Sequence, residues 1–269
     1  VADLHHLLPD SGVLFVVEHF LRINAMLLGI KGAKIEQLKE IGSATLSAEL
    51  KHKAGIRNSH IVGPVTQEKG RVIGGPAITL QFMPIREDYY EDKSEYQEVE
   101  KQLHRHALYL AEAGDIVVVD ARADMQSGVF GEMMLTYLQG KGGEGIIVDG
   151  VVRDSQPALE TGLGMWVRGF TPNYHIQTGI FPFSVNCPIA CGGRLVFPGD
   201  IIIADDDGVV VIPLQLVDDI IAHAGTHKDW EVFSKLRLSE GGDLRKYYPL
   251  TEEAQQEFEE WKKTHKSGV

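Results

Sequence analysis

The chain has 269 residues, 43% of them hydrophobic and 24% charged, and a formal net charge of −12. These values are typical of a globular protein with one main core, and they exclude a disordered or fibrous chain. The negative charge argues against a nucleic-acid surface, and no apolar run reaches the roughly 18 residues of a membrane span. We therefore expect a cytoplasmic protein without nucleic-acid or membrane partners, in which Cys187 and Cys191 are reduced thiols.

The first part of the chain is predicted to be helical. Apolar spacing at residues 13–28 and 34–40 indicates a helical extension, 1–41, that packs on the core. Glycine and proline punctuate residues 63–76, and the alternation at 77–82 then predicts a half-buried strand. The charged residues 86–106 predict a solvated insertion and helix.

A change of pattern at Gly114 predicts a β-α-β unit. Continuous β-branched residues predict buried strands at 116–120 and 145–149, and residues 121–130 are expected to form a loop. Helical spacing at 131–139 lies between the strands, so they are expected to be parallel.

Five further strands are predicted after this unit, at residues 165–168, 181–185, 194–197, 201–204 and 209–213. Asp205, Asp206 and Asp207 join the last two strands. They could form a metal cluster, but followed by a glycine they are better explained as hairpin turn residues. Beyond residue 214 the pattern is helical, and the amphipathic helix predicted at 252–266 could dock on a neighbouring subunit.

The β-α-β unit brings several chemically useful residues to one edge of the sheet. Glu132 begins the helix after the first strand, and Arg153 and Asp154 follow the second strand, so they are expected to face each other. The free amides of Met133 and Met134, at the positive end of the helix dipole, would donate hydrogen bonds to a substrate carboxylate.

The same edge suits a divalent cation and an oxo-acid. Asp154 offers a hard oxygen to Mg²⁺ or Mn²⁺, with Glu132 as a second ligand, directly or through water. Arg153 would bind a carboxylate or a developing enolate oxygen. Each residue also has a structural explanation: Glu132 is stabilised by the helix dipole, and Asp154 could cap the next helix. Arg153 could pair with Asp149 or Asp120.

Four segments resemble the RraA-like family. They are the strand at 114–120, the helix start at 131–134, the strand and loop at 145–154, and the hairpin region at 198–213. This family includes 4-hydroxy-4-methyl-2-oxoglutarate and 4-carboxy-4-hydroxy-2-oxoadipate aldolases, and also the regulator of ribonuclease activity A. The resemblance covers roughly residues 42–215.

The resemblance implies an α/β fold with α/β/β/α layers, assembled as a homotrimer or homohexamer with sites between subunits. A catalytic domain, 42–215, would carry the insertion at 86–106 and lie between helical extensions at 1–41 and 216–269. By position in the family, Asp154 binds the metal, Arg153 contacts the oxo group, and the amides of Met133 and Met134 hold the pyruvyl carboxylate. Glu132 is the acidic residue near the metal.

The implied reaction is the retro-aldol cleavage of a 4-hydroxy-2-oxo acid to release pyruvate, with oxaloacetate decarboxylation as a second activity. One position departs from the family aldolases, which carry an acid three residues after the metal-binding Asp. Here that residue is Pro157, and the next acid is Glu160. Two other functions are compatible with the sequence: dehydration or hydrolysis of another hydroxy or sugar acid, and non-catalytic binding of a ribonuclease.

Overall fold

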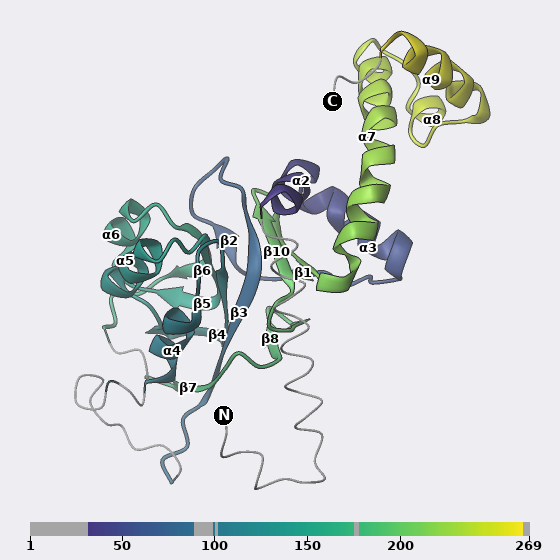
Figure 1. Cartoon of the computed structure of the whole chain (residues 1–269). Coiled ribbons are helices and arrows are strands. Elements are labelled where there is room, and N and C mark those ends of the chain that lie inside the picture. Colours follow the sequence, from purple (N-terminus) through teal and green to yellow (C-terminus); the bar gives the residue numbers. More distant parts are fainter. Residues whose placement is uncertain (1–31, 89–98, 100–101, 175–177, 266–269) are drawn as a thin grey trace, which may run out of the picture. The chain divides into compact units, whose positions relative to one another are not determined.

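The computed structural model describes residues 32–88, 99, 102–174 and 178–265 (Figure 1). It contains two compact units, Val1–Val217 and Asp218–Val269, which are described separately below. The helix predicted at 13–28 and much of the charged insertion at 86–106 lie outside the described residues. None of the described helices is both long enough and apolar enough to cross a bilayer.

The described residues of the first unit form eleven strands. Their bounds are β1 (His60–Ile61), β2 (Val65–Thr66), β3 (Ile73–Pro84), β4 (Ile116–Gly128), β5 (Gly145–Val152), β6 (Gly164–Phe170), β7 (Ile180–Val185), β8 (Ile189–Cys191), β9 (Arg194–Val196), β10 (Ile201–Asp205) and β11 (Gly208–Ile212). The main sheet has the order β1-β11-β10-β3-β4-β5-β6-β2, β7 pairs with β3, and β8 and β9 form a separate hairpin.

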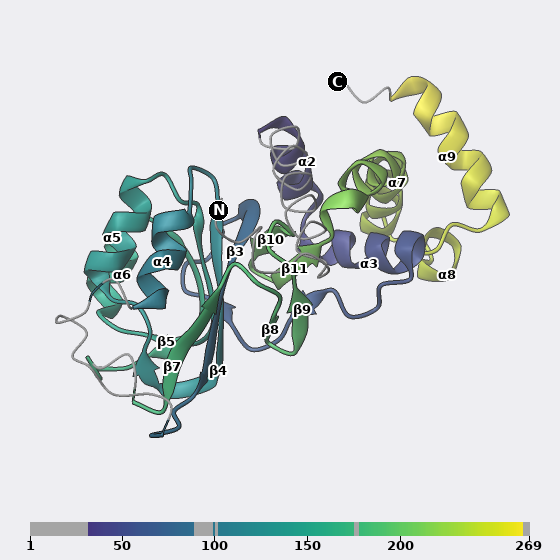
Figure 2. The same ribbon diagram turned by 60° about the horizontal axis from the view of Figure 1, so that its bottom comes forward.

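Strand β3 divides the main sheet into two layers. Its residues Ile73–Pro76 pair with β10 in antiparallel register, whereas Ala77–Gln81 pair with β4 in parallel register. One hydrophobic core lies between the resulting β-layers and contains Trp166 at 0% exposure. Figure 2 shows β10 and β11 on one side of β3 and β4 and β5 on the other.

Helices cover the outer faces of both β-layers. Helices α2 (Ala33–Ile41) and α3 (Ser43–Ala54) pack on the layer of β10 and β11. Helices α4 (Leu103–Leu110), α5 (Glu132–Gly140) and α6 (Ser155–Glu160) pack on the β3 to β6 layer across a second core. The predicted α/β/β/α layering is therefore confirmed (Figure 1).

Helix α3 and the start of β3 differ from the sequence prediction, and in both cases the cause is a residue far away along the chain. Helix α3 was not predicted; its first residue, Ser43, donates from its amide and hydroxyl to Asp205, 162 residues away. Strand β3 begins at Ile73, within the stretch 63–76 whose glycines and prolines predicted turns before the strand. At position 75 the strand passes close to the backbone of Gly114. A Cβ atom there would lie 2.0 Å from the Gly114 carbonyl oxygen, so only glycine allows this close approach.

The predicted β-α-β unit is confirmed as β4-α5-β5. Strands β4 and β5 are parallel, with Ile116 opposite Gly145. Strand β4 is longer than predicted, because residues expected to form a loop resume pairing at Asp124 after an irregular segment. In that segment Arg122 and Ala123 have φ values of 57° and 56°. This left-handed backbone conformation is uncommon for residues other than glycine.

The second unit is helical, as the sequence predicted beyond residue 214. It holds most of α7 (Val217–Ser239), with α8 (Leu244–Tyr247) and α9 (Glu252–Thr264). Phe233 is fully buried, and its ring lies 5.6 Å from that of Phe258. This aromatic contact joins α7 to α9 within the unit, and docking of α9 on a neighbouring subunit stays a prediction.

Candidate functional site

The structure brings Glu132 and the Arg153–Asp154 pair together at the carboxyl ends of β4 and β5. Helix α5 begins at Glu132, with Gly131 as its N-cap residue, and Asp154 follows β5 directly before α6. The Asp154 Oδ2 atom accepts a hydrogen bond from the backbone amide of Glu132 at 3.0 Å. The site is therefore organised around a carboxylate that contacts the start of the neighbouring helix.

Asp154 has an unusual backbone conformation. Its φ and ψ angles are 61° and 51°, in the left-handed region that is uncommon for residues other than glycine. It occupies the N-cap position of α6, but its side chain makes no capping hydrogen bond to that helix. The side chain therefore reaches α5 instead, and its exposed fraction of 44% leaves it accessible to a ligand.

Arg153 is held beside this carboxylate. Its Nη1 atom donates to the carbonyl oxygen of Gly128 at 3.0 Å, and its Nε lies 3.7 Å from Asp154 Oδ2. The Arg153 side chain is only 16% exposed. Among the described residues, no acceptor bonds to the remaining nitrogen, Nη2, which is therefore available to a ligand oxygen.

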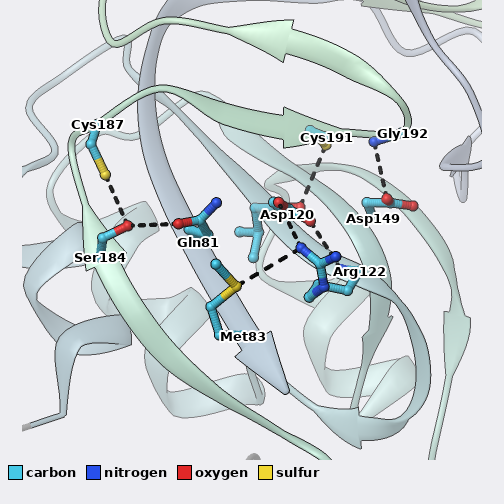
Figure 3. Close-up of polar contacts among 10 residues, drawn as sticks. Gln81, Met83, Asp120, Arg122, Asp149, Ser184, Cys187, Cys191 and Gly192 are labelled. Atoms are coloured by element: carbon cyan, nitrogen blue, oxygen red, sulfur yellow. Dashed lines mark hydrogen bonds and ion pairs between the residues drawn. The ribbon is translucent and has the colours of Figure 1, made fainter. Parts of the chain in front are cut away.

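Arg153 does not form the structural ion pairs that the sequence also allowed. The Asp149 carboxylate pairs with Arg168 and accepts a hydrogen bond from the Gly192 amide at 3.0 Å. Asp120 accepts from the Arg122 amide at 3.1 Å, and burial raises the pKa of its carboxyl (Figure 3). Both acids therefore have partners other than Arg153.

The two amides expected to be free at the start of α5 differ. The Met134 amide donates to the Gly131 carbonyl oxygen at 3.1 Å, so the expectation of a free amide is wrong for Met134. The Met133 amide has no acceptor among the described residues, and its side chain is 80% exposed. One free amide at the positive end of a helix can orient an anionic group.

A hard divalent cation fits the donors present. Asp154 Oδ1 has no hydrogen-bond partner within the described part of the chain, and Glu132, whose amide binds Asp154 Oδ2, is an exposed residue at the start of α5. Across the described residues, no three His, Cys, Asp or Glu side chains converge. Mg²⁺ and Mn²⁺ commonly take one or two carboxylates and keep several waters, so these two acids suffice.

The other acids named from the sequence have structural roles. Asp205 holds the start of α3, and Asp206 accepts a hydrogen bond from the Gly70 amide at 2.9 Å, which supports turn residues rather than a metal cluster. Pro157 lies inside α6. Glu160 accepts from the Gln156 side chain at 3.1 Å on the surface.

Sequence reasoning assigned no role to two glycines next to the site. Gly128 supplies the carbonyl that binds Arg153, and Gly131 lies against both members of the Arg153–Asp154 pair. The only signal in the sequence was a pair of glycines close to a predicted helix start, which turn chemistry explains equally well.

The match to a protein-family model decides the family. Residues 43–211 match the RraA-like model, described as Aldolase/RraA. The chain belongs to the RraA-like family. A solved RraA-like structure, RraAS2 of Streptomyces coelicolor, described as an unusual member of the RNase ES inhibitor RraA protein family, shares 39% identity. It has a TM-score of 0.69 and covers 77% of this chain and 98% of its own.

Two other proteins are similar to this chain. A protein of Halalkalibacterium halodurans named "Putative 4-hydroxy-4-methyl-2-oxoglutarate aldolase" is 36% identical over 118 residues, which is 44% of this chain. The match spans 55% of that relative, or about half of its length. An uncharacterized protein from Pseudomonas syringae, 21% identical with a TM-score of 0.66, shares the fold over 80% of this chain and 92% of its own.

Proposed function

We propose that this RraA-like protein is a divalent-metal-dependent lyase that cleaves a 4-hydroxy-2-oxo acid by a retro-aldol reaction and releases pyruvate. One observation carries the proposal: Asp154 is held by the Glu132 amide beside Arg153, at the start of α5, where the Met133 amide has no acceptor among the described residues. A carboxylate oxygen, a guanidinium nitrogen and an amide thus come together on one exposed edge. The name of the H. halodurans relative supports the substrate class.

The site residues would divide the work as follows. The Met133 amide and the helix dipole hold the carboxylate of the pyruvyl half. Arg153 donates to the 2-oxo oxygen, where negative charge develops as the bond between carbons 3 and 4 breaks. Glu132, directly or through water, takes the proton of the 4-hydroxyl group. Carbon 4 and its oxygen leave as the carbonyl group of the second product, and the pyruvate enolate takes a proton at carbon 3, from protonated Glu132 or water, to give pyruvate.

A divalent cation would be held by Asp154, with Glu132 as a second ligand directly or through water. When bound, Mg²⁺ or Mn²⁺ supplies Lewis-acid polarisation of the 2-oxo group. Oxaloacetate decarboxylation produces the same enolate and is proposed as a side activity. The homotrimer or homohexamer expected from the family is also part of the proposal, because a neighbouring subunit could add a further acid.

Pyruvate release provides the test. The protein, stripped with EDTA and resupplied with Mg²⁺ or Mn²⁺, is assayed on 4-hydroxy-4-methyl-2-oxoglutarate and on oxaloacetate. Asp154→Asn keeps the side-chain shape and is expected to lower turnover by more than about a hundredfold, because loss of a direct metal ligand costs more than loss of its supporting partners. Asp206→Asn, in an exposed turn outside the site, is the control.

Metal-dependent turnover that is lost only in Asp154→Asn would support the lyase. Absence of turnover in all four combinations of metal and substrate would contradict it.

The S. coelicolor relative favours a second candidate, a protein that binds a ribonuclease, because its description places it in an RNase ES inhibitor family. Such binding has no need of the Asp154 carboxylate. Inhibition of RNase ES that is equal for the wild type and Asp154→Asn, without pyruvate release, would support this candidate over the lyase.

A further inference from the structure

Two glycines lie against the Arg153–Asp154 pair, and their backbone conformation does not require glycine. Gly131 has φ and ψ angles of −128° and 178°, an extended conformation that any residue adopts. Gly128 is likewise absent from the residues with positive φ. The reason for glycine at these positions must therefore be space rather than conformational freedom.

The space at Gly131 is occupied by the functional groups of the site. A Cβ atom on Gly131 would lie 2.5 Å from Asp154 Oδ2 and 2.6 Å from Arg153 Nε, closer than real Cβ contacts. A Cβ on Gly128 would lie 2.7 Å from the Asn173 carbonyl oxygen and 3.2 Å from Arg153 Cβ. Of the two, only Gly131 is a position at which a Cβ atom would meet the polar ends of both side chains.

These polar ends cannot move away freely. Asp154 Oδ2 is fixed by the Glu132 amide at 3.0 Å, and the Arg153 guanidinium is fixed by the Gly128 carbonyl oxygen, also at 3.0 Å. A methyl group at position 131 would have to displace Oδ2 by about half an ångström or more to reach an acceptable contact distance. A displacement of about half an ångström is already as large as the positional tolerance of a functional site. The Glu132 hydrogen bond would lengthen or break.

We propose that Gly131 is a positioning residue of this site, acting through Asp154. The absence of its side chain lets Oδ2 bind the Glu132 amide, so that Oδ1, which has no partner among the described residues, becomes the oxygen presented to a divalent cation. The metal part of this inference rests on the proposed function. The geometric part, the contact between Asp154 and the Glu132 amide, does not.

The test compares Gly131→Ala with a matched control in the same helix. Gly140 ends α5, its φ is not positive, and a Cβ there meets nothing within 4 Å. In the full-length protein, Mn²⁺ affinity is measured by electron paramagnetic resonance and thermal stability by the unfolding midpoint. We expect Gly131→Ala to weaken Mn²⁺ binding at least about tenfold while Gly140→Ala does not, with both variants folded.

A second measurement needs no metal. Hydrogen exchange at the Glu132 amide, measured by NMR and corrected for the intrinsic rate of each sequence, is expected to accelerate at least about tenfold in Gly131→Ala only. Equal exchange in both variants would overturn the inference whatever the metal result. If the wild type binds Mn²⁺, equal Mn²⁺ affinity of the two variants would overturn it as well. Faster exchange in Gly131→Ala, with no Mn²⁺ bound by the wild type, would uphold the positioning role and contradict the metal-dependent lyase instead.

Discussion

Asp200 makes the folding stability of the first unit depend on pH. The residue is 8% exposed, and its carboxylate accepts a hydrogen bond from the Phe197 amide at 2.8 Å. Burial raises the pKa of this carboxyl from 3.8 to about 6, against the smaller opposing effect of the Phe197 hydrogen bond. The folded state therefore binds the proton more tightly than the unfolded chain does.

The sign and the size of the effect follow from this difference. The stabilising contribution of the protonated carboxyl is fully present below about pH 3.8 and is lost as the pH rises to about 6. A rise of roughly two pKa units corresponds to about 3 kcal/mol of unfolding free energy. About 2 kcal/mol of this is lost between about pH 4.5 and about pH 8.

Asp200→Asn removes the charge and keeps an acceptor oxygen for the Phe197 amide. Urea unfolding is followed by the fluorescence of Trp166, with Trp230 and Trp261 of the other unit replaced by Phe in both proteins. The stability of the variant relative to the wild type is expected to increase by about 2 kcal/mol from about pH 4.5 to about pH 8. A difference that stays constant or shrinks over this range would refute the reasoning.

Two further predictions concern the frame that carries the site. Gly75→Ala is expected to lower the unfolding free energy by about 3 kcal/mol, because its Cβ meets the Gly114 backbone oxygen. Gly74→Ala, whose Cβ meets only side-chain atoms, should cost clearly less in the same urea titration. Asp205→Ala removes the acceptor at the start of α3 and should cost about 2 kcal/mol. Asp207→Ala, on an exposed residue of the same turn, should change thermal stability by about 0.5 kcal/mol or less; equal losses would contradict the assigned role of Asp205.

Local patterns in the sequence predicted those elements that are stabilised locally. The β4-α5-β5 unit and the β10-β11 hairpin follow from apolar periodicity and turn residues, which act over a few positions. Helix α3 and the start of β3 could not be predicted in this way. The start of α3 depends on the carboxylate of Asp205, which lies 162 residues away from Ser43. The start of β3 depends on the backbone of Gly114, which only a glycine at position 75 can approach so closely.

The topology of the unit also predicted that Glu132, Arg153 and Asp154 meet at one edge. It could not predict what each group does there, because that depends on single torsions and on distances of a few tenths of an ångström. The left-handed backbone of Asp154 and the engaged Met134 amide are of this kind. The position of the site was therefore predictable, and the hydrogen bonds within it were not.

Strand β3 has a consequence for how the first unit opens. Because Ile73–Pro76 pair with β10 and Ala77–Gln81 pair with β4, the strand cannot leave one layer without disturbing the other. The two β-layers are therefore expected to behave as a single foldon, with the slowest amides of both exchanging through one shared opening event. In such a molecule the loops at the ends of β4 and β5 can fluctuate while the strands beneath them stay closed.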